Sequence, residues 1–274
     1  MMLAPINIIR SILPRVSKFF KPQSLSLKQV NYRGKTFVVN AKEEVGKRLI
    51  VKKEFESHEI SCLEKLIREN DVCLDIGGNI GIYSVFMASK AHLGRVISFE
   101  PVPINRGILA LNIVLNGINN VEVKDYAIND YSGTTQFTVC EDAAYSSIIA
   151  TNRKKEACLL DVPSRTLDDL FAVEGKKIDI IKIDVEGAEL HVLKGGERLL
   201  SNPQLRPRAL LIELNHKNQA VYGYAPPDVI SFMKVVGYDV YSIVGSEVAA
   251  GWPVDGCTED ALFLSCDDTE NDRN

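Results

Sequence analysis

From Val72 onward, short apolar runs alternate with stretches of helical periodicity. Before the first run and between the later ones, apolar residues recur every three or four positions, as in amphipathic helices over 56–70 and 103–117. The runs suit strands buried on both faces of a parallel sheet, and they lie at 72–76, 95–99, 121–126, 178–183, 209–214, 238–244 and 261–266. This alternation predicts an α/β fold with a seven-stranded, mostly parallel sheet, helices on both faces and an antiparallel last strand.

Two flanking segments differ from this pattern. In 26–53, Val30, Tyr32, Thr36 and Val38 alternate around a turn at Arg33-Gly34-Lys35, which predicts a small β element. Residues 1–22 are apolar and basic together. They predict a helix that packs either on the domain or on a second subunit, and we favour this interpretation. The alternative is a peripheral helix at a membrane surface. We therefore expect an N-terminal unit over 1–53, a main domain over 54–266 and a flexible acidic tail over 267–274.

Composition narrows the class of protein. The formal net charge of −4 argues against a nucleic-acid partner, because nucleic-acid binders usually carry a basic excess. The six cysteines include no C-x-x-C pair, so we expect reduced thiols and a cytoplasmic protein.

A glycine-rich turn follows the first of the predicted strands. Asp75 stands in the strand, and Gly77, Gly78 and Gly81 follow, with Asn79 between them. Glycines let the chain turn sharply and let a ligand approach bare peptide groups. The spacing D-x-G-x-x-x-G differs from the G-x-G-x-x-G of dinucleotide sites. It suits S-adenosylmethionine, whose amino-acid end needs both a carboxylate and N–H groups.

Acids at the next strand ends extend the expected cofactor site. Glu100 ends the second strand, 25 residues after Asp75, where an acid can bind both ribose hydroxyls. Asp125, Tyr126 and Ala127 end the third strand. They should lie beside the adenine, because ligands of open α/β sheets lie outside the carboxyl ends of the strands.

A second strand–turn–helix segment places acids in a catalytic position. Asp184 and Glu186 stand where the strand over 178–183 meets its helix. Glu189 follows in the first helical turn, where the helix dipole explains an acid. His216 lies just beyond the fifth strand. The sequence thus predicts a catalytic acid pair and a nearby histidine at one edge of the sheet.

Three stretches in combination resemble the FkbM-like family of class I S-adenosylmethionine-dependent methyltransferases. They are LDIGGNIGIYS (74–84), FEPVPIN with LALNIVLNG (99–105 and 109–117) and IKIDVEGAELHVLKGG (181–196). The family more often has Ala where this chain has Gly78. The resemblance implies a Rossmann-like class I methyltransferase fold and O-methylation of a hydroxyl on a sugar, glycolipid or polyketide-type product. The cofactor residues that we expect are Asp75, Gly77, Gly78, Asn79, Gly81, Tyr83, Ser84, Glu100, Asp125, Ala127 and Asp184.

Methyl transfer to a hydroxyl needs aligned reactants and a group that removes the hydroxyl proton. Glu186, Asp184 and His216, in that order, are the candidate catalytic residues. We expect no metal, but a Mg²⁺-assisted enzyme that uses Asp184, Glu186 and Glu213 as oxygen ligands is an alternative. An NAD-dependent oxidoreductase and a non-catalytic binding module are further alternatives. The spacing of the glycines argues against the first, and the retained acids argue against the second.

Overall fold

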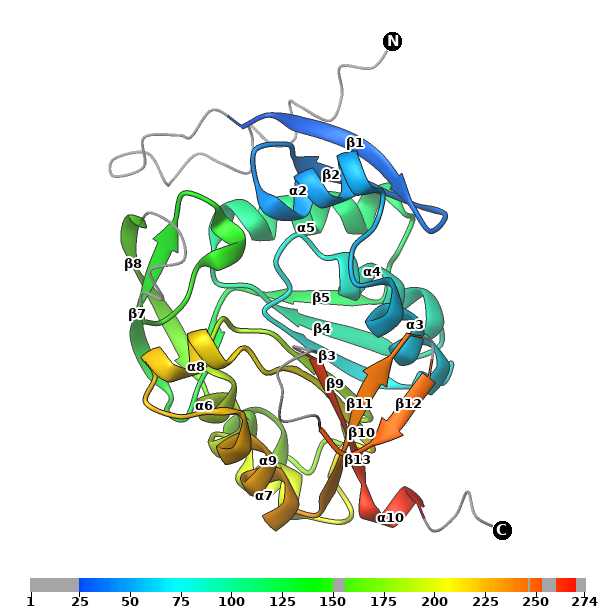
Figure 1. The fold of residues 1–274 in the computed structure, drawn as a ribbon, viewed down its shortest axis with the longest axis vertical. Helices are drawn as coiled ribbons and strands as arrows, with labels where there is room; N and C mark the ends of the chain where they lie inside the picture. The colour runs from blue at the N-terminus through cyan, green and yellow to red at the C-terminus, as the bar shows by residue number, and fades with distance from the viewer. Residues whose placement is uncertain (1–24, 150–155, 246, 253–259, 270–274) are drawn as a thin grey trace.

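The computed structural model describes residues 25–149, 156–245, 247–252 and 260–269 (Figure 1). The predictions for 1–22 and for the end of the acidic tail lie outside these ranges. The described main sheet has the strand order β12-β11-β13-β10-β9-β3-β4-β5. The strands are β3 (Val72–Ile76), β4 (Arg95–Phe99), β5 (Val121–Lys124), β9 (Ile180–Ile183), β10 (Ala209–Glu213), β11 (Tyr238–Val244), β12 (Glu247–Ala250) and β13 (Asp260–Ser265).

The direction of the strands follows the prediction. β10, β9, β3, β4 and β5 pair in parallel, and β13 is antiparallel to both β10 and β11. The mostly parallel sheet with an antiparallel last strand is therefore confirmed. The strand number differs, because the exposed segment β12 pairs with β11 and makes eight described strands. The sequence does not predict β12, since its four residues have no buried face.

Helices cover both faces of the main sheet, as predicted (Figure 1). They are α3 (Ser57–Leu66), α4 (Ile82–Lys90), α5 (Pro103–Leu115), α6 (Glu189–Lys194), α7 (Glu197–Ser201) and α9 (Pro226–Val235). Two buried clusters lie on opposite sides of the strands, one beneath α3, α4 and α5 and the other beneath α6, α7 and α9. Two short helices, α8 (His216–Val221) and α10 (Cys266–Thr269), follow strand ends. Within the described ranges, no helix is long and apolar enough to cross a membrane.

The N-terminal β element is a hairpin of β1 (Leu27–Tyr32) and β2 (Lys35–Asn40), followed by α2 (Glu44–Lys47) and the π-helical turn η1 (Arg48–Lys52). The predicted face of its second strand is wrong. The turn holds two residues, so Tyr32 pairs with Lys35 and Val30 with Phe37. A change of one residue in the turn moves every following side chain to the other face. Phe37 and Val39 therefore point into the core.

A small second sheet, which we call the side sheet, stands beside the carboxyl edge of the main sheet. Its order is β6-β8-β7, with β6 (Ala127–Ile128), β7 (Gly133–Cys140) and β8 (Glu156–Arg165). The turns η2 (Ala143–Tyr145) and η3 (Asp168–Ala172) adjoin it. The sequence from Thr134 to Cys140 predicts a strand, which β7 confirms, whereas β8 was not predicted. Pro163 lies just outside the two residues of β8 that pair with β6.

Candidate active site

The glycine turn after β3 lies directly against the end of β9. The N–H groups of Gly77 and Gly78 both donate to the carbonyl oxygen of Phe99, at 3.0 Å each. Gly77 has a φ of 83°, and a Cβ there would lie 1.8 Å from the carbonyl oxygen of Asp184. A Cβ at Gly78 would lie 2.1 Å from the Ser98 hydroxyl. The two strongest motifs of the sequence thus meet at one point, with no room for side chains between them.

Glu100 is held between the first two strand ends. Its Oε2 accepts a hydrogen bond from the backbone N–H of Asn79 at 2.8 Å, and its Oε1 accepts one from Val102 at 2.7 Å. Burial raises the pKa of Glu100 to about 8, although the N–H groups of Val102 and Asn79 oppose this shift. Each oxygen keeps a second lone pair. The carboxylate can therefore accept further hydrogen bonds from a ligand.

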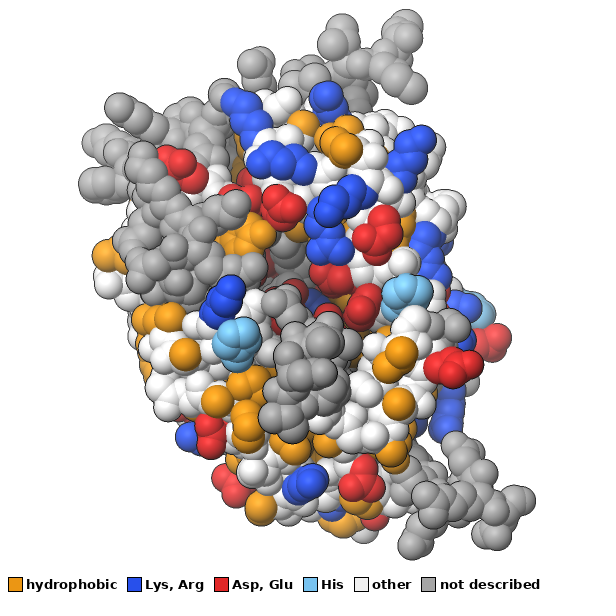
Figure 2. All heavy atoms as spheres, viewed as in Figure 1, with side chains coloured by type: hydrophobic (Ala, Val, Ile, Leu, Met, Phe, Trp, Pro, Cys, Tyr) orange, Lys and Arg blue, Asp and Glu red, His pale blue; other side chains and the backbone are white. Residues whose placement is uncertain are grey.

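A cavity opens at the carboxyl edge, between the main sheet and the side sheet. Figure 2 shows acidic side chains gathered around a hollow on this face. Among the predicted site residues, the cavity wall contains Gly77, Asn79, Glu100, Ala127, Asp184 and Glu186. Tyr126 also lines it, with its ring centroid 5.5 Å from that of Phe99. The cavity therefore brings together the ends of β3, β4, β5 and β9.

Other predicted residues lie away from this cavity wall. Asp125 and His216 are exposed and are not part of it. Asp75, Tyr83 and Ser84 are buried next to it, and so is Gly81 behind the turn. The Ser84 hydroxyl donates to Asp75 Oδ2 at 2.5 Å. These buried residues can support the glycine turn from within.

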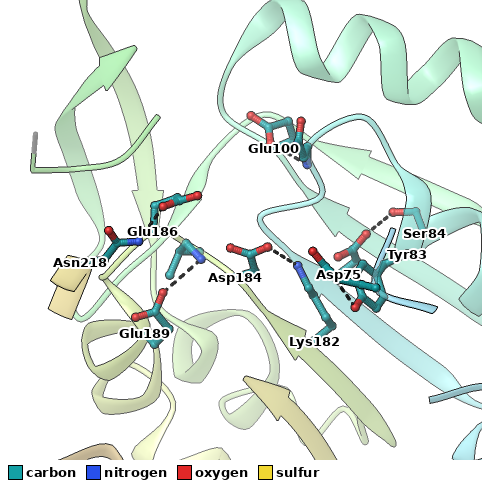
Figure 3. A network of polar contacts seen from close by, with 12 residues as sticks. Asp75, Tyr83, Ser84, Glu100, Lys182, Asp184, Glu186, Glu189 and Asn218 are labelled. Carbon is teal, nitrogen blue, oxygen red and sulfur yellow. Dashed lines mark hydrogen bonds and ion pairs between the residues drawn. The ribbon is translucent and has the colours of Figure 1, made fainter. Parts of the chain in front are cut away.

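Lys182 is a buried cation that the sequence interpretation missed (Figure 3). Its Nζ lies 2.9 Å from Asp184 Oδ2 and 4.7 Å from the centre of the Tyr83 ring. Burial disfavours its charged form, but the carboxylates of Asp184, Asp75 and Glu56 outweigh this and raise the pKa of Lys182. Burial raises the pKa of Asp75, whereas Lys182 opposes that shift. Lys182 thus compensates the negative charge beneath the cavity.

Glu186 stands at the tip of the turn after β9. Its backbone has a φ of 55°, in the left-handed region that non-glycine residues rarely adopt. The residue is 9% exposed, and its Oε2 accepts a hydrogen bond from Asn218 Nδ2 at 2.7 Å. The strained turn and the amide of α8 together fix this carboxylate at the cavity wall.

Glu189, in contrast, holds the turn together. Its Oε1 accepts hydrogen bonds from the N–H groups of Gly187 at 2.9 Å and Val185 at 3.3 Å. Its Oε2 accepts from Gln219 and from the Tyr224 hydroxyl. These contacts join the turn after β9 to α8 and to Tyr224, so Glu189 stabilises the turn in addition to the helix-dipole role that its position predicts.

The carboxylates of Asp184, Glu186 and Glu213 converge. One oxygen of each lies within 4.8 Å of the others. Glu213 Oε2 is buried, and no described group donates a hydrogen bond to it. Burial, followed by the charges of Asp184 and Glu186, raises the pKa of Glu213 well above its ordinary value. Three oxygen ligands at this spacing are compatible with a hard divalent cation.

The site residues that the sequence analysis missed make contacts between different elements of the fold. Asn218 reaches Glu186 from 32 positions further along the chain, and no local pattern signals that contact. Asn105 lines the cavity from α5, a helix whose other buried residues are apolar except for Asn112. An amide buried among apolar residues is the one signal that the sequence offered for Asn105.

The order of the strands in the main sheet and the residues at its carboxyl edge define the class of protein. Five parallel strands, an antiparallel strand inserted beside β10, and a glycine turn and a strand-end acid at one cavity characterise the class I S-adenosylmethionine-dependent methyltransferases. A sequence model of the methyltransferase FkbM domain matches residues 75–240, more than half of the chain. The chain belongs to the FkbM methyltransferase family, and the methyl donor of such a domain is S-adenosylmethionine.

Three curated relatives are similar to parts of the chain. Methyltransferase sdnD of Sordaria araneosa is 28% identical, over 46% of this chain and 60% of its own. The 31-O-demethyl-FK506 methyltransferase FkbM of Streptomyces tacrolimicus is 29% identical, over 48% and 61%. Hexuronic acid methyltransferase AglP of Haloferax volcanii is 30% identical, over 46% and 50%. This chain therefore spans 50–61% of the length of these relatives.

Proposed function

We propose that this protein transfers a methyl group from S-adenosylmethionine to a hydroxyl of a sugar, glycolipid or related natural product. The observation that carries the proposal is the cavity, whose wall contains both Glu100 and the acids after β9, Asp184 and Glu186. Two relatives support the acceptor class, because their names specify a hexuronic acid and 31-O-demethyl-FK506.

The residues divide into two proposed groups. Glu100 binds the ribose hydroxyls, and the turn from Gly77 to Gly81 binds the amino-acid end through backbone groups. When bound, S-adenosylmethionine supplies an electrophilic methyl on a sulfonium. Glu186 accepts the proton of the acceptor hydroxyl while the new O–C bond forms and the S–C bond breaks. The products are then a methyl ether and S-adenosylhomocysteine, with the proton on Glu186.

Glu186 remains the first candidate for the base. Asp184 is second, since it already accepts a hydrogen bond from Lys182. His216 is third, because it is exposed and outside the cavity wall. An acceptor that fills the opening of the cavity could still approach it.

A metal-assisted version of the same transfer is the second candidate, supported by the convergence of Asp184, Glu186 and Glu213. The three carboxylates would hold Mg²⁺, which would bind and acidify the acceptor hydroxyl. Dialysis against a chelator separates the two versions. Full activity afterwards favours the metal-free transfer, and a loss that Mg²⁺ restores favours the metal-assisted one.

The acceptor can be identified by comparing cells with and without the gene. Mass spectrometry of their glycans and lipids should reveal one class of molecule that is lighter by one methyl group when the gene is absent. If the mass difference occurs in nucleic acid or protein instead, the proposed acceptor class is wrong. Removing residues 1–22 in the same cells tests whether that segment supports peripheral access to a lipid-linked acceptor.

A further inference from the structure

We infer that Asn105 recognises the amino group of the cofactor's adenine. Asn105 is the third residue of α5, is 2% exposed and belongs to the cavity wall. Its Nδ2 donates a hydrogen bond to the carbonyl oxygen of Ala143 at 3.2 Å. Its Oδ1 is buried and receives no hydrogen bond from the described part of the chain. The inference rests on S-adenosylmethionine as donor and on Glu100 at the ribose, and it does not depend on the acceptor.

The orientation of this amide is fixed by its neighbour. The carbonyl oxygen of Ala143 can only accept, so the nitrogen of Asn105 must face it. The oxygen is then the side-chain atom that still needs a partner. A buried acceptor without one is costly. A donor that enters the cavity and reaches this oxygen therefore gains binding free energy that a solvent-exposed amide could not supply.

The cavity wall places the purine near Asn105. Through Asn79, Glu100 contacts the glycine turn, in which Gly77 lies against Asp184, and the methionine end and the acceptor must meet on this acidic side. Glu100 also accepts a hydrogen bond from Val102, which shares a buried apolar cluster with Phe137 and Ala143, and Asn105 donates to Ala143. The part of the wall around Asn105 is therefore mostly apolar and suits a flat base. With the sulfonium on the acidic side, the base takes the apolar side.

The chemistry of the base matches the oxygen. Adenine carries an amino group at its sixth position, which donates hydrogen bonds. Hypoxanthine carries a carbonyl there, which would place two acceptors against each other. A site built to bind a hydrogen-bonding group rejects analogues that lack it much more strongly than it rejects small changes in shape. Asn105 should therefore make the site selective for adenosine over inosine.

The experiment uses calorimetry with S-adenosylhomocysteine and its deaminated analogue, S-inosylhomocysteine. The wild-type protein should bind the adenosine compound more tightly by about tenfold or more, the usual effect of one unpaired buried group. Asn105→Ala should reduce this preference to about threefold or less, mainly by weakening the adenosine compound. Asn112→Ala is the matched control. Asn112 lies on the same helix, buried, and its amide is satisfied by Val38 and Ile80.

Each outcome decides one point. Equal binding of the two compounds by the wild-type protein overturns the inference without needing any variant to fold. A preference that persists in Asn105→Ala also overturns it, and a preference that disappears equally in Asn112→Ala assigns the effect to helix packing instead. If neither compound binds the wild-type protein, both this inference and the assignment of the cofactor site are wrong.

Discussion

Single residues decide the chemistry of this site, and those near a motif were predictable. Asp184 and Glu186 belong to one turn, so their spacing already places them together. Lys182 was not predicted, because its contact with Tyr83 joins two segments about 100 positions apart. Sequence patterns report which face a residue occupies and do not report which distant residue meets it there.

At the same scale, Glu100→Ala should weaken binding of S-adenosylmethionine. The loss of the carboxylate leaves the N–H groups of Asn79 and Val102 without their acceptor, and it removes the acceptor that we propose for the ribose hydroxyls. We expect a cost of about 1–3 kcal/mol, measured by calorimetry. Asp125→Ala is the control and should leave the affinity for the cofactor unchanged, because Asp125 is exposed and outside the cavity wall. Unchanged affinity in Glu100→Ala would remove Glu100 from the cofactor site.

The buried carboxyl of Glu43 predicts how the folding stability depends on pH. Burial, only partly opposed by the hydrogen bond from Asn40, raises the pKa of Glu43 to about 7. The folded protein therefore binds this proton more tightly than the unfolded chain does. Its contribution to stability is complete below the ordinary pKa of 4.5 and is lost as pH rises through about 7.

The test is urea unfolding of wild type and Glu43→Gln between pH 5 and pH 8. Relative to wild type, the glutamine variant should gain about 2–4 kcal/mol in unfolding free energy over this interval. Stability curves that run parallel across the whole interval would show that Glu43 is not the group that titrates.

Elements were predictable where their own residues set the boundaries. α5 begins at Pro103 and ends at Leu115, as its proline and its Asn116-Gly117 pair indicate. The face of β2 was not predictable, since it depends on whether the turn before it holds two or three residues. β8 was not predicted, and it contains Pro163, a residue that disfavours a strand interior, just before the two residues that pair with β6.

The glycine turn after β3 gives the element-scale prediction. Gly77→Ala adds a Cβ that meets the carbonyl oxygen of Asp184, and Gly34→Ala adds one at a similar φ with open space around it. Gly34→Ala should cost about 1–2 kcal/mol of unfolding free energy, from backbone strain alone. Gly77→Ala should cost more than about 4 kcal/mol, measured by chemical denaturation. Equal costs would show that the turn and β9 are not in contact.

The architecture of the whole molecule follows from the alternation of strands and helices, which predicts the sheet and its antiparallel strand. The alternation did not predict how the N-terminal hairpin is attached. Phe37 is fully buried and packs 6.0 Å from the ring of Phe86 in α4, within a cluster that also contains main-sheet residues. Residues 26–53 therefore share a core with the main sheet.

Phe37→Ala tests this shared core. The substitution should lower the unfolding free energy of the entire molecule by about 3–5 kcal/mol, because it leaves a large cavity. Val51→Ala, at a residue that is 77% exposed, should change it by less than about 0.5 kcal/mol. A Phe37→Ala protein that melts in two steps, with the larger step unchanged, would indicate an independent N-terminal unit.

The central claim, methyl transfer to a hydroxyl with Glu186 as the base, is tested by the fate of a labelled methyl group. Purified protein and S-adenosylmethionine with an isotopically labelled methyl are mixed with glycan and lipid extracts of cells that lack the gene. We expect the label in a methyl ether of one glycan or lipid, and a rate about 10²–10⁴-fold lower with Glu186→Gln at unchanged cofactor affinity. Label on nitrogen or carbon, or an undiminished rate with Glu186→Gln, would contradict the claim.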